Sequence, residues 1–214
     1  MDLPQLSDEV PAQRPFVAAR ATPWPGQLAV YRSPGADGFA LQTTIDRPAR
    51  IGSLAADLFA GPTSRFDMGN ALLLDLPEGR LDSVTDLTLF GGANALAVES
   101  APGIWEVLQA RNAELVAPGR YRLTHLLRGQ RGTEGTMGNP APAGARVVVL
   151  DESIVPLPIS EADIGIPWNW RVGPAARAFT DASYVAQSFT PGGVGLRPFT
   201  VAHVEQPWRK PRTP

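Results

Sequence analysis

The sequence predicts a mostly β protein, with an antiparallel barrel-like or two-sheet architecture and at most one or two short helices. Short runs of β-branched and aromatic residues recur along the chain, separated by clusters of turn-forming residues. Glycine (21) and proline (22) are abundant among the 214 residues and follow no strict period. This length allows one large domain or two small ones, either with a substantial core.

Three parts are expected along the chain. Residues 1–15 are polar and contain proline, so they are predicted to be a flexible lead-in. Residues 16–196 form the β-rich domain, as one unit or as two halves at about 16–103 and 104–196. Residues 197–214 are basic and interrupted by prolines, which is typical of a linker toward a following domain.

In the first half, residues 27–33 and 39–45 are predicted strands joined by the turn sequence SPGADG, which makes a hairpin. Residues 53–61 are the best helix candidate, because Ser53 can cap the start and Gly61 the end. A buried strand is expected at 71–76. Strands at 86–90 and 94–100 flank Gly91-Gly92 and suggest a second hairpin.

In the second half, residues 104–110 are predicted to be a strand that ends in a turn at Arg111-Asn112. Residues 120–127 alternate, which places Tyr121, Leu123, His125 and Leu127 on one face of a strand. A further strand is expected at 145–151, followed by short strands separated by glycine and proline turns.

Composition excludes several function classes. The 19 basic and 21 acidic residues give no overall basic charge, which argues against a general nucleic-acid binder. Cysteine is absent, so neither disulfides nor thiolate sites are available. The two histidines offer little for zinc, and no apolar run approaches the roughly 20 residues of a spanning helix. We expect no metal, no cofactor and no membrane-spanning segment.

The stretch LLRGQRGTEG, residues 126–135, is the most distinctive motif. It is not a Walker loop, because Lys210 is the only lysine, and the glycines and prolines that follow cannot form the helix of a dinucleotide site. We interpret it as a structural corner. Its glycines supply positive φ values, while Arg128, Arg131 and Glu134 lock the loop through charged hydrogen bonds.

Two other functions remain open from the residues alone. Glu99, Glu106 and Glu114 include candidates for the paired carboxylates of a glycan hydrolase, although the sequence has neither G-x-S-x-G nor H-E-x-x-H. Trp168 and Trp170 alternate on a strand and therefore share a face, as in a sugar-stacking platform. A place in the core or at an assembly interface is the favoured interpretation of both tryptophans.

The run GRYRLTHLLRGQRGTE, followed by AGARVVVLD, resembles a domain of the large tail-tip proteins of gene transfer agents and related tailed phages. PWPGQLAVYRSPGADGF and DLTLFGGANALAVES resemble the same family, and the likeness spans most of residues 20–208. These are long proteins with a glycoside-hydrolase TIM-barrel-like region and a phage tail domain.

The resemblance implies a non-enzymatic assembly role in the tail tip or baseplate hub of a virion or gene transfer agent particle, assembled in the bacterial cytoplasm. It implies contact with the host envelope and a part in DNA delivery, with DNA only passing through the tail. The expected partners are other domains and subunits, with a cell-surface glycan or receptor as a further candidate. No catalytic residue carries over. The structural motif comprises Arg128, Gly129, Arg131, Gly132, Thr133 and Glu134.

The alternative to this role is a carbohydrate- or receptor-binding module that uses Trp168 and Trp170. A glycan hydrolase is the weaker alternative.

Overall fold

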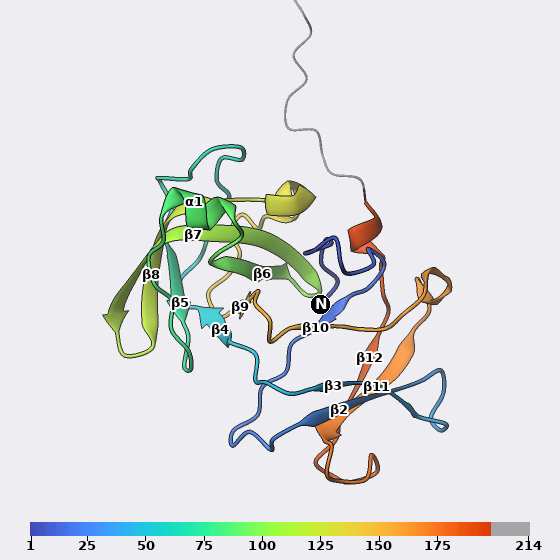
Figure 1. Ribbon diagram of the computed structural model, residues 1–214. Coiled ribbons are helices and arrows are strands. Elements are labelled where there is room, and N and C mark those ends of the chain that lie inside the picture. The colour runs from blue at the N-terminus through green and yellow to red at the C-terminus, as the bar shows by residue number, and fades with distance from the viewer. Residues whose placement is uncertain (198–214) are drawn as a thin grey trace, which may run out of the picture.

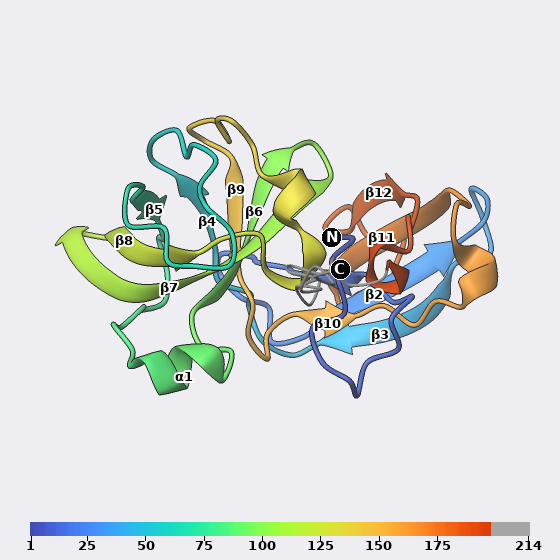
Figure 2. The same ribbon diagram turned by 90° about the horizontal axis from the view of Figure 1, so that it is seen from above.

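The computed structural model describes residues 1–197 and confirms the mostly β fold (Figure 1). Its strands form a closed six-stranded barrel, a four-stranded sheet and a two-stranded ribbon. Every strand pair is antiparallel. The barrel and the four-stranded sheet lie side by side (Figure 2).

The barrel strands follow the order β4-β5-β8-β7-β6-β9, and the pairing of β4 with β9 closes the ring. Leucine and valine side chains from all six strands fill its interior, so the barrel has a packed core. The strands are β4 (Ile51–Leu54), β5 (Leu72–Asp75), β6 (Ala95–Ala101), β7 (Ile104–Ala117), β8 (Arg120–Leu127) and β9 (Arg146–Val149).

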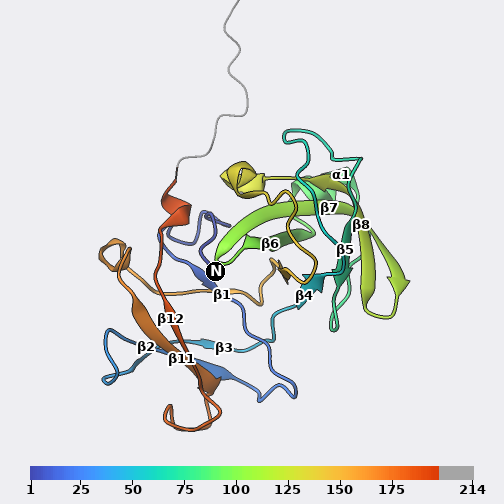
Figure 3. The same cartoon turned by 180° about the vertical axis from the view of Figure 1, so that it is seen from behind.

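The four-stranded sheet has the order β12-β11-β2-β3 and combines segments from both ends of the chain. Its hairpin of β2 and β3 confirms the prediction at 27–33 and 39–45. The strands are β2 (Leu28–Ser33), β3 (Ala40–Ile45), β11 (Trp168–Pro174) and β12 (Val185–Phe189). The ribbon of β1 (Phe16–Val17) and β10 (Val155–Pro156) lies between the sheet and the barrel (Figure 3).

This topology does not divide the chain at residues 103 and 104. Gly103 lies in the turn of the β6–β7 hairpin and Ile104 begins β7, so a boundary here would separate two paired strands. The barrel, residues 51–149, is instead inserted between the β3 and β10 segments. The structural division therefore separates the barrel from the sheet that its flanking segments build.

The predicted helix at 53–61 is wrong. Ser53 pairs with Arg146 inside β4, and Leu54 and Leu58 are buried in the barrel core. Core packing decides the conformation of this segment, against its local capping signals. The predicted strand at 86–90 is instead the short helix α1 (Asp86–Phe90). Its N-cap is Thr85, whose side chain accepts a hydrogen bond from the Thr88 amide at 3.3 Å.

Strand β7 continues past the turn predicted at Arg111-Asn112, because Asn112 pairs with Thr124 of β8. In β8 the predicted alternation fails at His125, which has a φ of 55°. After this residue the pattern shifts by one, so Leu126 joins Tyr121 and Leu123 in the barrel core. His125 is half-buried, with its Nδ1 atom 3.0 Å from Asn112 Nδ2.

Residues 1–15, predicted to be a flexible lead-in, contain no strand but are anchored by packing. Leu3 is only 1% exposed, in a cluster with Phe16 and Trp105, and the Phe16 amide donates to the Met1 carbonyl at 2.8 Å. The predicted linker lies outside the described residues except for Arg197. Within residues 1–197, no helix has the length and hydropathy needed to cross a membrane. The 3₁₀ turns are Gln130–Gly132, Glu134–Thr136, Glu161–Asp163 and Val194–Leu196.

Candidate functional site

Arg128 lies at the centre of a buried ion-pair network at one end of the barrel. It directly follows β8 and is 1% exposed. Its partner Glu106 lies on β7, on the same face as Leu108 and Ala110 of the barrel core. The carboxylate is also buried, so a full charge pair seals this end of the core.

The guanidinium group holds three chain segments together. Its Nε and Nη2 atoms donate to the two carboxylate oxygens of Glu106, at 2.7 and 2.9 Å. Its Nη1 atom donates to the Phe59 carbonyl at 2.9 Å and to Asp67 Oδ2 at 3.3 Å. This geometry joins β7, the end of β8 and the loop of residues 55–70 at a single side chain.

Asp67 reaches the network because the loop around it is tightly folded. The amides of Gly69 and Asn70 donate to Asp67 Oδ1, each at 3.1 Å, as in an Asx turn. A Cβ atom at Gly61 would lie 2.0 Å from Asp67 Oδ2, so only glycine fits there. Burial raises the pKa of Asp67, but hydrogen bonds from Asn70 and Gly69 and the charge of Arg128 outweigh it, and the pKa is lowered.

Two of the three glycines of the motif, Gly129 and Gly132, have the positive φ values that the sequence predicts, and Gly135 does not. Gly129 has a φ of 57°, and a Cβ atom there would lie 2.6 Å from Glu134 Cα. Gly132 has a φ of 79°. Arg131 also has a positive φ, 59°, although it has a side chain. The segment is therefore a tight corner made of two 3₁₀ turns.

Two of the other motif residues attach this corner to the N-terminal segment and to β7. Arg131 Nη1 donates to the Gln5 carbonyl at 2.8 Å. The Thr133 hydroxyl is buried, accepts from the Val107 amide at 2.9 Å and donates to the Gln130 carbonyl at 2.7 Å. Glu134 makes no hydrogen bond or ion pair within the described part of the chain, which differs from its predicted charged contact. Its backbone packs against Gly129 instead.

The corner binds the carboxylate of Glu106, which is part of the same chain. Glu106 accepts the two hydrogen bonds from Arg128 and a third from the Gly129 amide, at 3.2 Å to Oε1. These donors are therefore already occupied, and burial excludes water from the pair. The arrangement supports a structural role and gives no support to a phosphate-binding loop.

The three glutamates considered for hydrolysis do not converge. Glu106 is buried against Arg128, and Glu99 pairs opposite Trp105, on the other face of the β6–β7 ribbon. Arg146 donates to both Glu99 oxygens, at 2.6 and 2.7 Å, and the resulting hydrogen bonds lower the pKa of Glu99. Glu114 lies eight residues beyond Glu106, about 27 Å away along an extended strand.

Trp168 and Trp170 pack in the same hydrophobic cluster of the four-stranded sheet, as their alternation predicts. Their shared face is covered, because the Arg32 guanidinium lies 4.1 Å from the Trp168 ring centroid and 5.8 Å from that of Trp170. Arg32 is itself paired with Asp163 at 3.2 Å. Trp170 is 5% exposed, so the two indoles do not form an open stacking platform.

Within residues 1–197, no three histidine, aspartate or glutamate side chains are grouped so that they could hold a metal ion. Sequence analysis missed the two partners of Arg128, Glu106 and Asp67. Glu106 appeared there only as a hydrolase candidate. The one available signal was Glu106 itself, an acidic residue in the mostly apolar strand sequence IWEVLQA.

Residues 49–148 match the model of a family described as "Rcc01698-like, C-terminal". The match covers slightly less than half of the chain. It begins just before β4 and ends within β9, so it coincides with the barrel and includes the corner after Arg128. No curated protein matches the chain.

Replacing Arg128 tests the network. Arg128→Ala leaves Glu106 and Asp67 buried without their cation, and we expect the free energy of unfolding to fall by about 3–5 kcal/mol in urea denaturation. Arg120→Ala is the matched control, since Arg120 also binds a carboxylate through two nitrogens, at 2.6 and 2.9 Å to Asp75, but is partly exposed. It should cost much less than Arg128→Ala, because solvent screens the exposed pair. Equal losses for the two variants would contradict the assigned role.

Gly132→Val tests the corner. A β-branched residue at a φ of 79° is strained, and we expect a loss of at least about 1–3 kcal/mol in thermal or chemical unfolding. Gly135→Val is the control, because Gly135 has no positive φ and a Cβ atom there would meet nothing within 4 Å. If the Gly132 variant melts like the parent protein, the corner does not depend on its backbone geometry.

The lowered pKa of Asp67 predicts a pH dependence of stability. A carboxyl group with a depressed folded-state pKa adds stability above its unfolded pKa of about 3.9, and this contribution is lost as pH falls toward the folded value. Asp67→Asn should therefore be less stable than the parent at about pH 6, with a difference that narrows toward about pH 2.5. A difference independent of pH, measured by urea denaturation, would exclude this linkage.

Proposed function

We propose that the protein is a structural component of a phage-like tail tip or baseplate hub, in a gene transfer agent or tailed phage. In this role it contributes to assembly, contact with the host envelope and DNA delivery. The observation that carries the proposal is the network around Arg128. The most distinctive motif of the chain builds a sealed joint within the barrel and presents no reactive group.

Two sequence relationships support the tail-tip assignment. The region GRYRLTHLLRGQRGTE through AGARVVVLD resembles tail-tip proteins, and it encodes β8, the corner and β9. The family match at residues 49–148 covers the same barrel. Both relationships therefore include the barrel.

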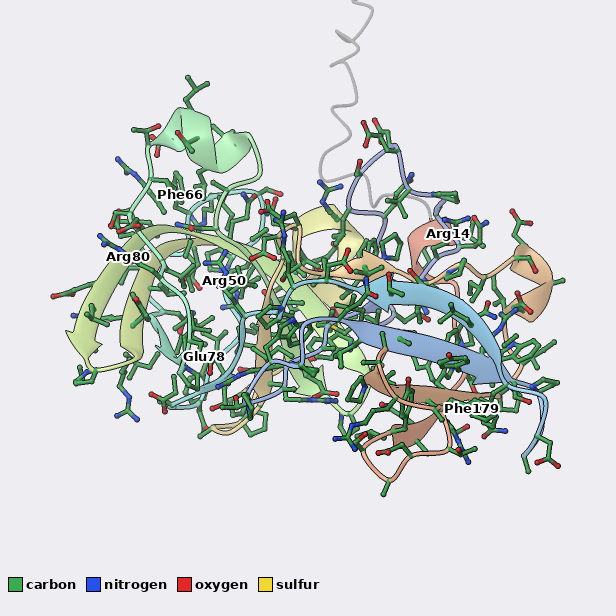
Figure 4. The ribbon with its side chains drawn as sticks, turned by 60° about the horizontal axis from the view of Figure 1, so that its bottom comes forward. Arg14, Arg50, Phe66, Glu78, Arg80 and Phe179 are labelled. Atoms are coloured by element: carbon green, nitrogen blue, oxygen red, sulfur yellow. The ribbon has the colours of Figure 1, made fainter. Side chains whose placement is uncertain are left out.

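The surface beside the network also supports an assembly role. Phe66, next to Asp67, lies close to α1 (Figure 4), and its ring centroid is 6.5 Å from that of Phe90. Phe59 and Met68, on the same loop of residues 55–70, are exposed, and so is Leu87 of α1. Exposed apolar side chains on a rigidly held loop are typical of protein contact surfaces.

Locating the protein in a particle tests the proposal. A short epitope inserted in the exposed β2–β3 turn, near Gly35, leaves the barrel and its network untouched. In a host that produces the particles, electron microscopy with an antibody to the epitope should show label at one end of the tail. Label on the capsid, or epitope recovered only outside particles, would contradict the proposal.

A glycan-binding assay separates the alternative function. The covered tryptophan face predicts no glycan binding by the parent protein. Binding that appears on a glycan array and is lost in Trp168→Ala would favour the carbohydrate-binding module instead. Binding that survives in this variant would place a glycan site elsewhere in the chain.

A further inference from the structure

Strand β12 is an open edge of the four-stranded sheet. Its only neighbour in the sheet order is β11, and the two strands pair in continuous register from Trp168 with Phe189 to Val172 with Val185. In an antiparallel pair, about half of the backbone N–H and C=O groups of an edge strand point away from its neighbour. Within residues 1–197, no backbone hydrogen bond reaches this outer side of β12. Figure 2 shows the strand at the border of the sheet.

The features that normally protect an edge strand from pairing are missing from β12. Its sequence, VAQSF, contains no charge and no proline, and its pairing with β11 contains no bulge. Val185 is 68% exposed. The other edge of the sheet, β3, differs because its pairing with β2 is irregular between Val30 and Tyr31. An unprotected edge is expected where another strand binds.

A cleft of about 960 Å³ lies between the barrel and the face of the sheet that carries Trp170 and Val172, and it extends to β12 at this edge. Val185, Gln187 and Phe189 line it, and the barrel contributes Trp105. Alternate residues of β12 thus border the cleft, which is the pattern of a strand with one face toward a cavity. Side chains at every second position of an added strand would enter the same cleft.

The charges around the cleft are already compensated. Arg146 pairs with Glu99 at 2.6 Å and Arg20 pairs with Glu78 at 3.0 Å. Asp2 accepts hydrogen bonds from the amides of Gly192 and Val194. The Met1 ammonium group also lines the cleft; it donates to the Phe16 carbonyl at 2.7 Å, and burial lowers its pKa to about 6. An occupant that complements it carries uncharged side chains on its inward face.

We propose that β12 binds one extended segment of a neighbouring polypeptide, which adds a fifth strand to the sheet. The segment has uncharged, mostly apolar residues at alternate positions, and these fill the cleft beside Trp105. A strand fits better than a sugar or a lipid, because the edge offers backbone donors and acceptors at the repeat of a β-strand. Its main chain supplies affinity, and its inward side chains supply selectivity.

A synthetic peptide tests this proposal on the full chain. The probe is an octapeptide of alternating valine and threonine with terminal lysines, and the control peptide has a proline at its centre. We expect the probe to slow amide hydrogen exchange of Val185–Phe189 by about tenfold or more at saturation, and the proline peptide to have no effect. No protection by the probe, or equal protection by both peptides, would overturn the proposal.

Two variants locate the binding face. Val185→Lys places a charge at the cleft and should weaken peptide binding about tenfold or more, whereas Ala186→Lys, on the opposite face of β12, should change it less than about threefold. Both residues are exposed, so circular dichroism should show that both variants fold. Equal losses in the two variants would contradict the assigned face.

Two further outcomes would count against an external strand. Binding of chitohexaose, with the peptide inactive, would assign the cleft to a glycan. Peptide binding that appears only in a chain ending at Arg197 would mean that residues 198–214 cover the edge.

Discussion

The structure depends on an ion pair in the protein interior, where charged groups lose the hydration that stabilises them in water. Moving Arg128 and Glu106 out of water costs several kcal/mol per ion, and the cost is tolerable only because the guanidinium donors and both carboxylate oxygens are bonded. The pair thereby fixes geometry more than it adds stability. It joins residues 22 and 61 positions apart in the sequence. A single side chain holds together one end of the barrel.

The features predictable from the sequence are those that local chemistry decides. The β2–β3 hairpin follows from two β-rich runs around a glycine- and proline-containing turn, and the corner follows from closely spaced glycines after a strand. At Gly132 the positive φ is a property of the residue itself, so no distant contact is needed to predict it. The same holds for Asp67, whose Asx turn uses only residues next to it.

Most of the features that could not be predicted depend on contacts between residues distant in sequence. One depends on whether helix capping or strand-like composition decides the conformation of a short segment. Nothing in the sequence shows that Glu106 would meet Arg128, because strand pairing alone brings them together. Residues 53–61 have a capped helical pattern, yet Leu54 and Leu58 fill the barrel core. At residues 86–90 the local capping signal decides instead: the Thr85 cap stabilises a helix although the composition is typical of a strand. His125 shifts the face of β8 without any sequence signal.

The family match and the open edge lie in different parts of the fold, the first in the barrel and the second in the four-stranded sheet. Residues 49–148, which match the family model, contain all of the barrel except the last residue of β9, and they include the network around Arg128. The four-stranded sheet is built from segments on both sides of that insertion, so the pairing of β2 with β11 joins parts of the chain that precede and follow the barrel. The open edge at β12 lies in this outer sheet. The network around Arg128 therefore lies inside the matched region, whereas the open edge, where we propose that a strand binds, lies outside it.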